Sequence, residues 1–100
     1  MLERFKVPER DRVYVAEAHV RAATEGIFRH SGISPEEAAS STDVLIKNDL
    51  RGVESHGVSN GLRRYVAEYS ANKLNPTPEF KIERETKTTM TVDADGALGI

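Results

Sequence analysis

The sequence predicts an α+β fold, with three helices over residues 9–73 followed by a β-hairpin over about residues 79–94. Two observations support this prediction. Apolar residues recur every three or four positions through the first part of the chain, and capping residues separate three such runs. After two prolines the apolar period changes to two, which is typical of strands. Because the strands follow the helices, a repeated βαβ arrangement is not expected.

Length and composition place the chain among single folded domains. Its 100 residues are 38% hydrophobic and 30% charged, and the net charge is −2. This balance predicts no attraction to nucleic acid or to anionic membranes. The absence of cysteine excludes disulfides and zinc–thiolate sites. No apolar run is long enough for a signal peptide or a membrane span, so we expect no membrane partner and a cytoplasmic location.

The first helix is predicted after Pro8 and ends at Gly32, which is placed as a C-terminal cap. The residues at helical spacing that would form its apolar stripe are Val13, Ala16, Val20, Ala23 and Ile27.

The second helix has the clearest boundaries. Ser34, Pro35 and Glu37 fit the N-cap, N1 and N3 positions of a capping box, and the helix is expected to end near Gly52.

The third helix is predicted to start at Ser55 as N-cap, with His56 and Gly57 as its first two helical residues. Tyr65 and Tyr69 lie on its apolar face and are expected in the core. The helix ends at residues 71–73, before Pro76 and Pro78. Residues 80–83 and 89–92 then alternate apolar with polar, which predicts two half-buried strands joined by a turn at residues 86–88.

Residues 55–57 raise a chemical question. A helix start favours an anion such as a carboxylate, and Gly57 would let a ligand approach the backbone closely. His56 would be placed there to exchange protons near neutral pH. The alternative is a helix cap that happens to contain a histidine. Further along, Arg63 or Arg64 would help to hold an anionic substrate, unless both are surface residues.

Other candidate sites are weaker. The three histidines are scattered without ligand spacing, so no metal site is predicted. The tail DADGALG lacks the ligands of a calcium loop and the Gly-Lys-Ser/Thr ending of a P-loop. Gly96 and Gly99 do not form the G-x-G-x-x-G pattern, so a turn is the expected structure. Because the chain stops within this glycine-rich stretch, we expect it to be the N-terminal part of a longer protein.

The stretch NDLRGVESHGVSNGLRRYV resembles the N-terminal signature of the malate/L-lactate dehydrogenase family, in which Asp-Leu-Arg-Gly is followed after two residues by Ser-His-Gly. Here these are residues 49–52 and 55–57. LNPTPEFKIERET and VDADGALG resemble later stretches of the same family, in the same order. The resemblance implies a larger, non-Rossmann fold, with residues 1–100 as its N-terminal portion.

The resemblance also implies an activity. Such an enzyme would transfer a hydride between NAD or NADP and a small 2-hydroxy or 2-oxo acid, with an active site near a homodimer interface. His56 would be the acid/base and Ser55 its partner, with Gly57 beside the substrate. Many members carry an arginine four residues after the histidine, where this sequence has Asn60, which we therefore also expect beside the substrate. Either Arg63 or Arg64 replaces that arginine, or the substrate differs. The alternative function is a truncated, non-catalytic helical module that packs against a partner subunit.

Overall fold

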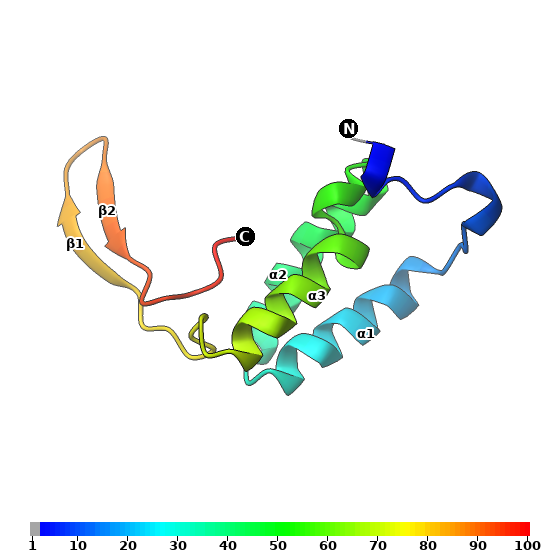
Figure 1. The fold of residues 1–100 in the computed structure, drawn as a ribbon. Coiled ribbons are helices and arrows are strands. Elements are labelled where there is room, and N and C mark those ends of the chain that lie inside the picture. Colours follow the sequence, from blue (N-terminus) through cyan, green and yellow to red (C-terminus); the bar gives the residue numbers. More distant parts are fainter. Residues whose placement is uncertain (1–2) are drawn as a thin grey trace.

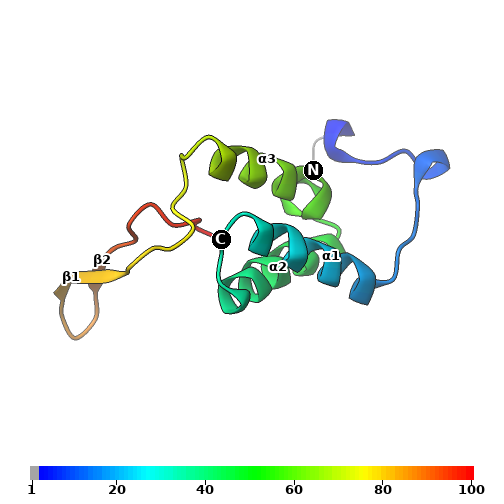
Figure 2. The ribbon, with the colours of Figure 1, turned by 90° about the horizontal axis from the view of Figure 1, so that it is seen from below.

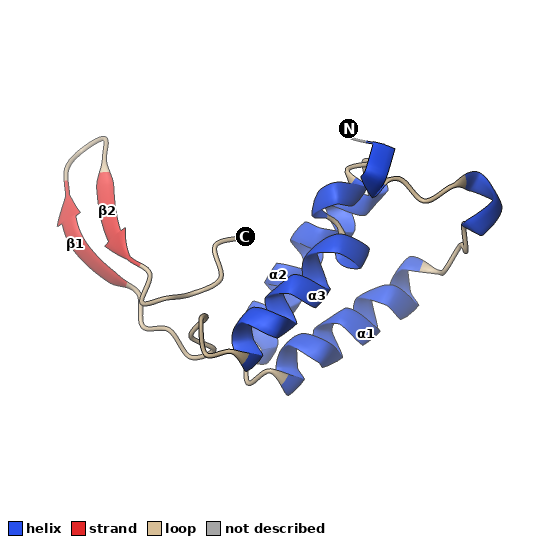
Figure 3. Ribbon diagram, in the orientation of Figure 1, coloured by secondary structure: helices blue, strands red, loops and turns tan. Residues whose placement is uncertain are grey.

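The computed structural model describes residues 3–100 and contains three α-helices followed by an antiparallel two-stranded sheet (Figure 1, Figure 3). The elements are α1 (Glu17–His30), α2 (Pro35–Leu50), α3 (Val58–Ser70), β1 (Lys81–Glu85) and β2 (Met90–Asp93), with short 3-10 turns η1 (Glu3–Phe5), η2 (Glu9–Asp11) and η3 (Glu54–His56). The predicted α+β class and the order of its elements are confirmed.

The core lies where the three helices meet. Viewed along a second direction, the helices lie side by side and the hairpin stays apart from them (Figure 2). The buried apolar cluster consists of Phe28, Ile33, Ala38, Leu45, Leu62 and Tyr65. Fully burying one large apolar side chain stabilises a fold by about 1.5–3 kcal/mol, so these contacts hold the helices together. The prediction that Tyr65 belongs to the core is confirmed, and Tyr69 packs against it partly buried.

The start of α2 follows the predicted capping box. Ser34 Oγ accepts a hydrogen bond from the Glu37 N–H at 3.2 Å, and Pro35 occupies the first helical position. Just before it, Gly32 has a φ of +94°, the left-handed conformation that ends α1. Both signals are local, and both are confirmed.

The predicted start of the first helix is wrong. Between Pro8 and Glu17 only the η2 turn is helical, and Val13 and Tyr14 are 83% and 89% exposed. Consecutive β-branched and aromatic residues favour extended backbone, whereas Glu17 suits the first turn of a helix. The apolar stripe is also displaced: the buried residues of α1 are Thr24 and Phe28, while Ala23 and Ile27 are exposed.

The hairpin has the predicted position but not the predicted burial. β1 and β2 pair antiparallel with Ile82 opposite Val92, and a bulge places Glu83 outside the register. All residues of both strands are exposed, so the expected half-buried face is wrong for residues 3–100. Ile82 and Val92 alternate as strand residues do, but they are 54% and 43% exposed.

The two ends of the hairpin are joined to each other at its base. The Asn75 N–H donates to the Gly96 carbonyl at 2.9 Å, and the Asn75 side chain donates to the Asp95 carbonyl at 3.0 Å. The Asp95 carboxylate in turn accepts from the Glu79 N–H at 3.1 Å. These bonds close the connection between α3 and the strands, and the hairpin projects from there (Figure 1).

Candidate active site

The turn η3 joins the end of α2 to the start of α3 and carries Ser55 and His56. It follows a tight helix end: Gly52 has a φ of +77°, the Gly52 N–H donates to the Asp49 carbonyl, and the Val53 N–H donates to the Asn48 carbonyl at 2.8 Å. This is the Schellman arrangement, which reverses the chain immediately after a helix. Gly52 therefore allows the chain to reverse direction just before Ser55 and His56.

Ser55 and His56 contact each other directly. Ser55 Oγ lies 2.8 Å from Nδ1 of His56, and the imidazole ring is exposed. Within residues 3–100, Nε2 of the ring has no hydrogen-bond partner. A ring held at one nitrogen and open at the other is the arrangement that proton transfer to a bound molecule requires.

The prediction that Ser55 caps the third helix is wrong. α3 begins at Val58, so Ser55 and His56 precede the helix, and Gly57 stands in the N-cap position without a side chain to offer. The cap comes from α2: the Asp49 carboxylate accepts the Val58 N–H at 2.8 Å. Ser55 cannot act as the cap because its hydroxyl is directed to the histidine ring.

Gly57 is needed because of this distant cap. A Cβ at position 57 would lie 1.6 Å from Asp49 Oδ1 and 2.3 Å from Asp49 Cγ, far inside van der Waals contact. The backbone itself sets no such demand, since φ is −92° and any residue can adopt it. The Asp49 carboxylate thus occupies the space in which a side chain at position 57 would lie.

Burial raises the pKa of Asp49, and the nearby charge of Glu54 raises it further. The hydrogen bond from the Val58 N–H opposes both effects, because it favours the ionised carboxylate. The carboxylate is therefore held beside η3 at a cost in solvation.

Two asparagines hold the backbone of η3. The Asn48 side chain donates to the His56 carbonyl at 3.0 Å, and the Asn60 side chain donates to the Glu54 carbonyl at 2.8 Å. From the sequence we expected Asn60 beside the substrate, but its amide reaches back to the turn. The spacing of residues in the sequence does not predict either hydrogen bond, because both bonds join the turn to a neighbouring helix.

Arg63 and Arg64 lie three and four residues after Asn60 on α3, and their side chains differ in surroundings. Arg64 lies over the Tyr65 ring, 5.0 Å from its centroid, with its Nε 4.0 Å from a Glu68 oxygen. Arg63 forms no ion pair within residues 3–100 and borders an apolar groove of about 330 Å³. The groove lies between α1 and α3, and its other lining residues are Ile27, Val58, Ser59, Leu62 and Val66.

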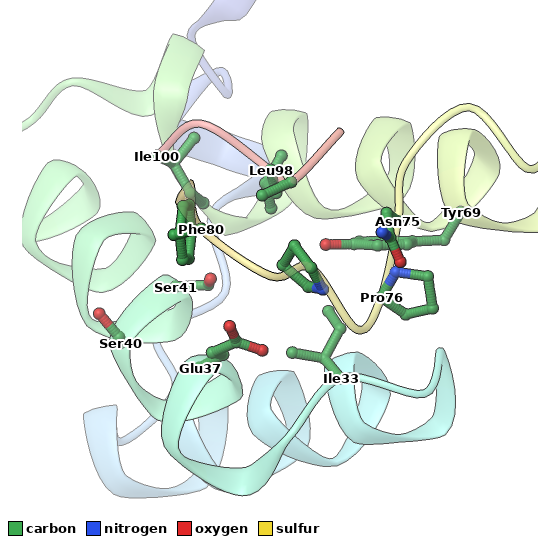
Figure 4. A pocket seen from close by; sticks show the side chains of 12 residues that line it. Ile33, Glu37, Ser40, Ser41, Tyr69, Asn75, Pro76, Phe80, Leu98 and Ile100 are labelled. Carbon is green, nitrogen blue, oxygen red and sulfur yellow. The ribbon is translucent and has the colours of Figure 1, made fainter. Parts of the chain in front are cut away.

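A separate pocket of about 220 Å³ lies near the start of α2 (Figure 4). Glu37, Tyr69 and Leu98 are among its lining residues, and burial raises the Tyr69 pKa, with a smaller contribution from the charge of Glu37. α2 has 16 residues and so is about 24 Å long, which separates this pocket from η3 at its far end. None of the residues singled out from the sequence for chemistry lines it.

The described part of the chain, residues 3–100, holds no cluster of acidic or histidine side chains arranged to bind a metal ion. Asp95 lies in the turn after β2, and Asp93, the last residue of β2, accepts the Asp95 N–H through Oδ1 at 2.9 Å. Over the same residues, no helix combines the length and apolar character that crossing a bilayer requires.

Known proteins are similar to this chain in sequence. The sequence is 33% identical to malate dehydrogenase of Pyrococcus horikoshii over 96 residues, covering 89% of this chain and 26% of that protein. It is 32% identical to L-sulfolactate dehydrogenase of Methanocaldococcus jannaschii over 73 residues, covering 73% of this chain and 21% of that protein. It is 33% identical to ureidoglycolate dehydrogenase (NAD(+)) of Escherichia coli over 69 residues, covering 69% of this chain and 20% of that protein.

The solved structure of the Pyrococcus horikoshii malate dehydrogenase superposes with a TM-score of 0.83 at 32% identity, covering 87% of this chain and 25% of that one. The chain therefore spans about a fifth to a quarter of the length of these relatives. A profile of the malate/L-lactate dehydrogenase family matches residues 15–100, which include α1 to α3, η3 and the hairpin. The chain belongs to the malate/L-lactate dehydrogenase family.

Proposed function

We propose that this chain supplies the acid/base end of an oxidoreductase active site that acts on a small 2-hydroxy or 2-oxo acid. The observation that carries the proposal is the 2.8 Å contact between Ser55 Oγ and His56 Nδ1 in an exposed ring. Family membership supports the reaction class, since the relatives above are named dehydrogenases. A further relative, from Escherichia coli, is named hydroxycarboxylate dehydrogenase B, which supports the substrate class.

In the proposed mechanism, His56 exchanges a proton with the substrate oxygen through Nε2. During oxidation, neutral His56 takes the hydroxyl proton at Nε2, and its Nδ1–H donates to Ser55 Oγ. In the tautomer that is protonated at Nδ1, the Nε2 lone pair is free to take this proton. During reduction, the imidazolium returns the proton to the carbonyl oxygen, where negative charge develops.

We assign the substrate carboxylate to Arg63 in preference to Arg64. The Arg64 guanidinium already lies over Tyr65 and near Glu68, whereas Arg63 has no ion-pair partner within residues 3–100. Arginine binds carboxylates through two parallel hydrogen bonds, which suits a small acid. Asn60 and Gly57 then serve the turn, Asn60 by its bond to Glu54 and Gly57 by admitting the Asp49 carboxylate.

NAD or NADP supplies or accepts the hydride in such reactions. The described residues do not fit a dinucleotide. Gly96 and Gly99 follow the second strand of an antiparallel hairpin, whereas a dinucleotide loop follows a strand of a parallel sheet. We therefore assign no residue of this chain to the cofactor. The homodimer and the cytoplasmic location likewise stay predictions.

The proposal is tested with His56→Ala in the full-length protein. Turnover of 2-hydroxy acids is expected to fall by about 10²- to 10⁴-fold, the usual worth of a general acid or base. NADH or NADPH binding, followed by fluorescence, should be retained. His30→Ala, at the exposed last residue of α1, is the matched control and should keep wild-type turnover. Unchanged turnover in His56→Ala would remove His56 from the mechanism.

In the same assays, Arg63→Ala should raise KM, with Arg64→Ala as its control. Absence of any wild-type turnover on 2-hydroxy acids, together with stable association with another subunit, would favour the non-catalytic module instead.

A further inference from the structure

We propose that Asp49 is a positioning residue for His56: by capping α3 from α2, it fixes the turn that carries the histidine and leaves Ser55 free to hold the imidazole ring. The inference rests on the proposed function only in assigning catalysis to His56. The geometric part concerns this turn alone.

The backbone of His56 is held on both sides. Its N–H donates to the Val53 carbonyl at 3.1 Å, and its carbonyl accepts from the Asn48 side chain at 3.0 Å. Two residues later, the Val58 N–H donates to Asp49 Oδ2 at 2.8 Å. Asn48 and Asp49 are neighbours in the last turn of α2. The end of α2 therefore grips the chain immediately after the ring.

The Asp49 carboxylate lies against Gly57, the residue between His56 and Val58. The two atoms of Asp49 nearest to a Cβ built on Gly57 would be 1.6 and 2.3 Å away. The carboxylate therefore packs directly on the backbone of residue 57. Movement of His56 relative to α3 would have to displace this carboxylate.

Asp49 and Ser55 make different contacts: Asp49 caps α3, and Ser55 contacts the His56 ring. A serine just before a helix ordinarily accepts an N–H from the first helical turn. Here Ser55 Oγ is 2.8 Å from His56 Nδ1 instead, and Asp49 satisfies the helix. If Asp49 were removed, the Val58 N–H would need another acceptor, and Ser55 is the hydroxyl three residues before it, the spacing at which a serine caps a helix. The structure thus assigns Asp49 the role of keeping Ser55 on the histidine.

The test uses the full-length protein and three variants. Asp49→Ala removes the cap. Asp49→Asn keeps the shape and one oxygen that can accept the Val58 N–H. Ser34→Ala removes the other side-chain cap, at the start of α2, where Ser34 binds Glu37 and not η3. Two readouts are taken: kcat and KM for 2-hydroxy acids across pH, and the pH titration of the His56 Cε1–H resonance in protein labelled with [¹³C-ε1]histidine.

For Asp49→Ala we expect kcat to fall by about 10- to 100-fold with a smaller change in KM, because slight misplacement of a reacting group carries losses of this order. The His56 resonance should shift or broaden, since the ring loses its fixed contact with Ser55. Asp49→Asn should restore most of kcat and the wild-type resonance. Ser34→Ala should lower thermal stability while leaving kcat and the resonance unchanged.

The proposal is overturned if Asp49→Ala leaves kcat and the His56 resonance unchanged. It is also overturned if Ser34→Ala lowers kcat as much as Asp49→Ala does, or if Asp49→Asn loses as much as Asp49→Ala. Failure of the proposed function looks different: wild-type protein would show no turnover of 2-hydroxy acids. The His56 resonance does not depend on turnover, so it decides the positioning role in that case as well.

Discussion

The two helices α2 and α3 begin in different ways. α2 is capped from within its own segment, where Ser34 accepts the Glu37 N–H three residues later. α3 is capped from the preceding helix, where Asp49 accepts the Val58 N–H nine residues later in the chain. The first cap forms a recognisable sequence pattern. The second forms only after the chain has turned back at Gly52.

The two caps therefore depend on different parts of the molecule. The start of α2 depends on four consecutive residues, so a substitution there should change the structure only locally. The start of α3 depends on the end of α2, on the backbone of η3 and on the missing side chain of Gly57. A substitution at any of these positions should therefore change the position of His56, which lies between them.

The largest effect on the free energy of unfolding is expected from Gly57→Ala. The added methyl group would meet the Asp49 carboxylate, and overpacking of this kind typically lowers the free energy of unfolding by about 1–3 kcal/mol. Denaturant unfolding monitored by circular dichroism measures the change. Gly26→Ala is the matched control, since no heavy atom lies within 4 Å of a Cβ there. In the interior of α1 it should stabilise by about 0.5–1 kcal/mol.

The Asp49→Ala/Gly57→Ala double variant tests whether the cost of the added methyl group depends on the Asp49 carboxylate. Once the carboxylate is gone, the methyl group has room, so Gly57→Ala should cost little more in that background. Strictly additive free energies would show that Gly57 is required for a reason other than Asp49.

A smaller effect is expected from Ser34→Ala, which should lower the free energy of unfolding by about 1 kcal/mol through the loss of a helix cap. Amide hydrogen exchange should accelerate in the first turn of α2 and remain unchanged in the first turn of α3. Asp49→Ala should give the reverse pattern. Equal acceleration at both helix starts in either variant would contradict the distinction between a local and a distant cap.

The smallest effect concerns pH. Because burial raises the folded-state pKa of Asp49, the folded protein holds this proton more tightly than the unfolded chain. Its contribution to the free energy of unfolding is thus greatest at low pH and falls as pH rises from the usual Asp pKa of about 3.9 through the raised value. Asp49→Asn should therefore gain stability relative to wild type as pH rises, measured by thermal unfolding across that range.

Asp43 on the same helix provides the control. Its pKa is lowered, chiefly by the side-chain hydrogen bond with Lys47, so its contribution is present above the usual Asp pKa and is lost as pH falls through the lowered value. Asp43→Asn should therefore lose stability relative to wild type as pH rises. The same sign of slope in both variants would show that the Asp49 carboxylate is not held in the way described.

Much of the fold could be predicted from local signals. The capping box at Ser34, Gly32 as the end of α1, and the change to a period of two after Pro78 all act over a few residues. The start of α1 could not, because Val13 lies at helical spacing from the true helix but remains outside it. Thr24 was missed as a buried residue because a polar side chain does not count toward an apolar stripe.

The site was predictable in composition and less so in construction. The resemblance pairs Ser55 with His56, and the two side chains are in contact, whereas the helix cap that the residue pattern predicted for Ser55 is wrong. The roles of Asp49 and Asn60 depend on contacts that form after the chain reverses. A glycine at position 57 suggested room for a ligand, whereas the space is taken by a carboxylate of the same chain. Spacing alone does not distinguish these two uses of glycine.

The exposed hairpin has a consequence for how the protein behaves in concentrated solution. Among the described residues, each strand has one unpaired edge. β1 carries Lys81, Glu83, Arg84 and Glu85, whereas β2 carries a charge only at Asp93. Charged side chains discourage a strand of another molecule from adding to a sheet edge. The β2 edge, with Met90 54% and Val92 43% exposed, is therefore the side from which self-association through strand addition would begin.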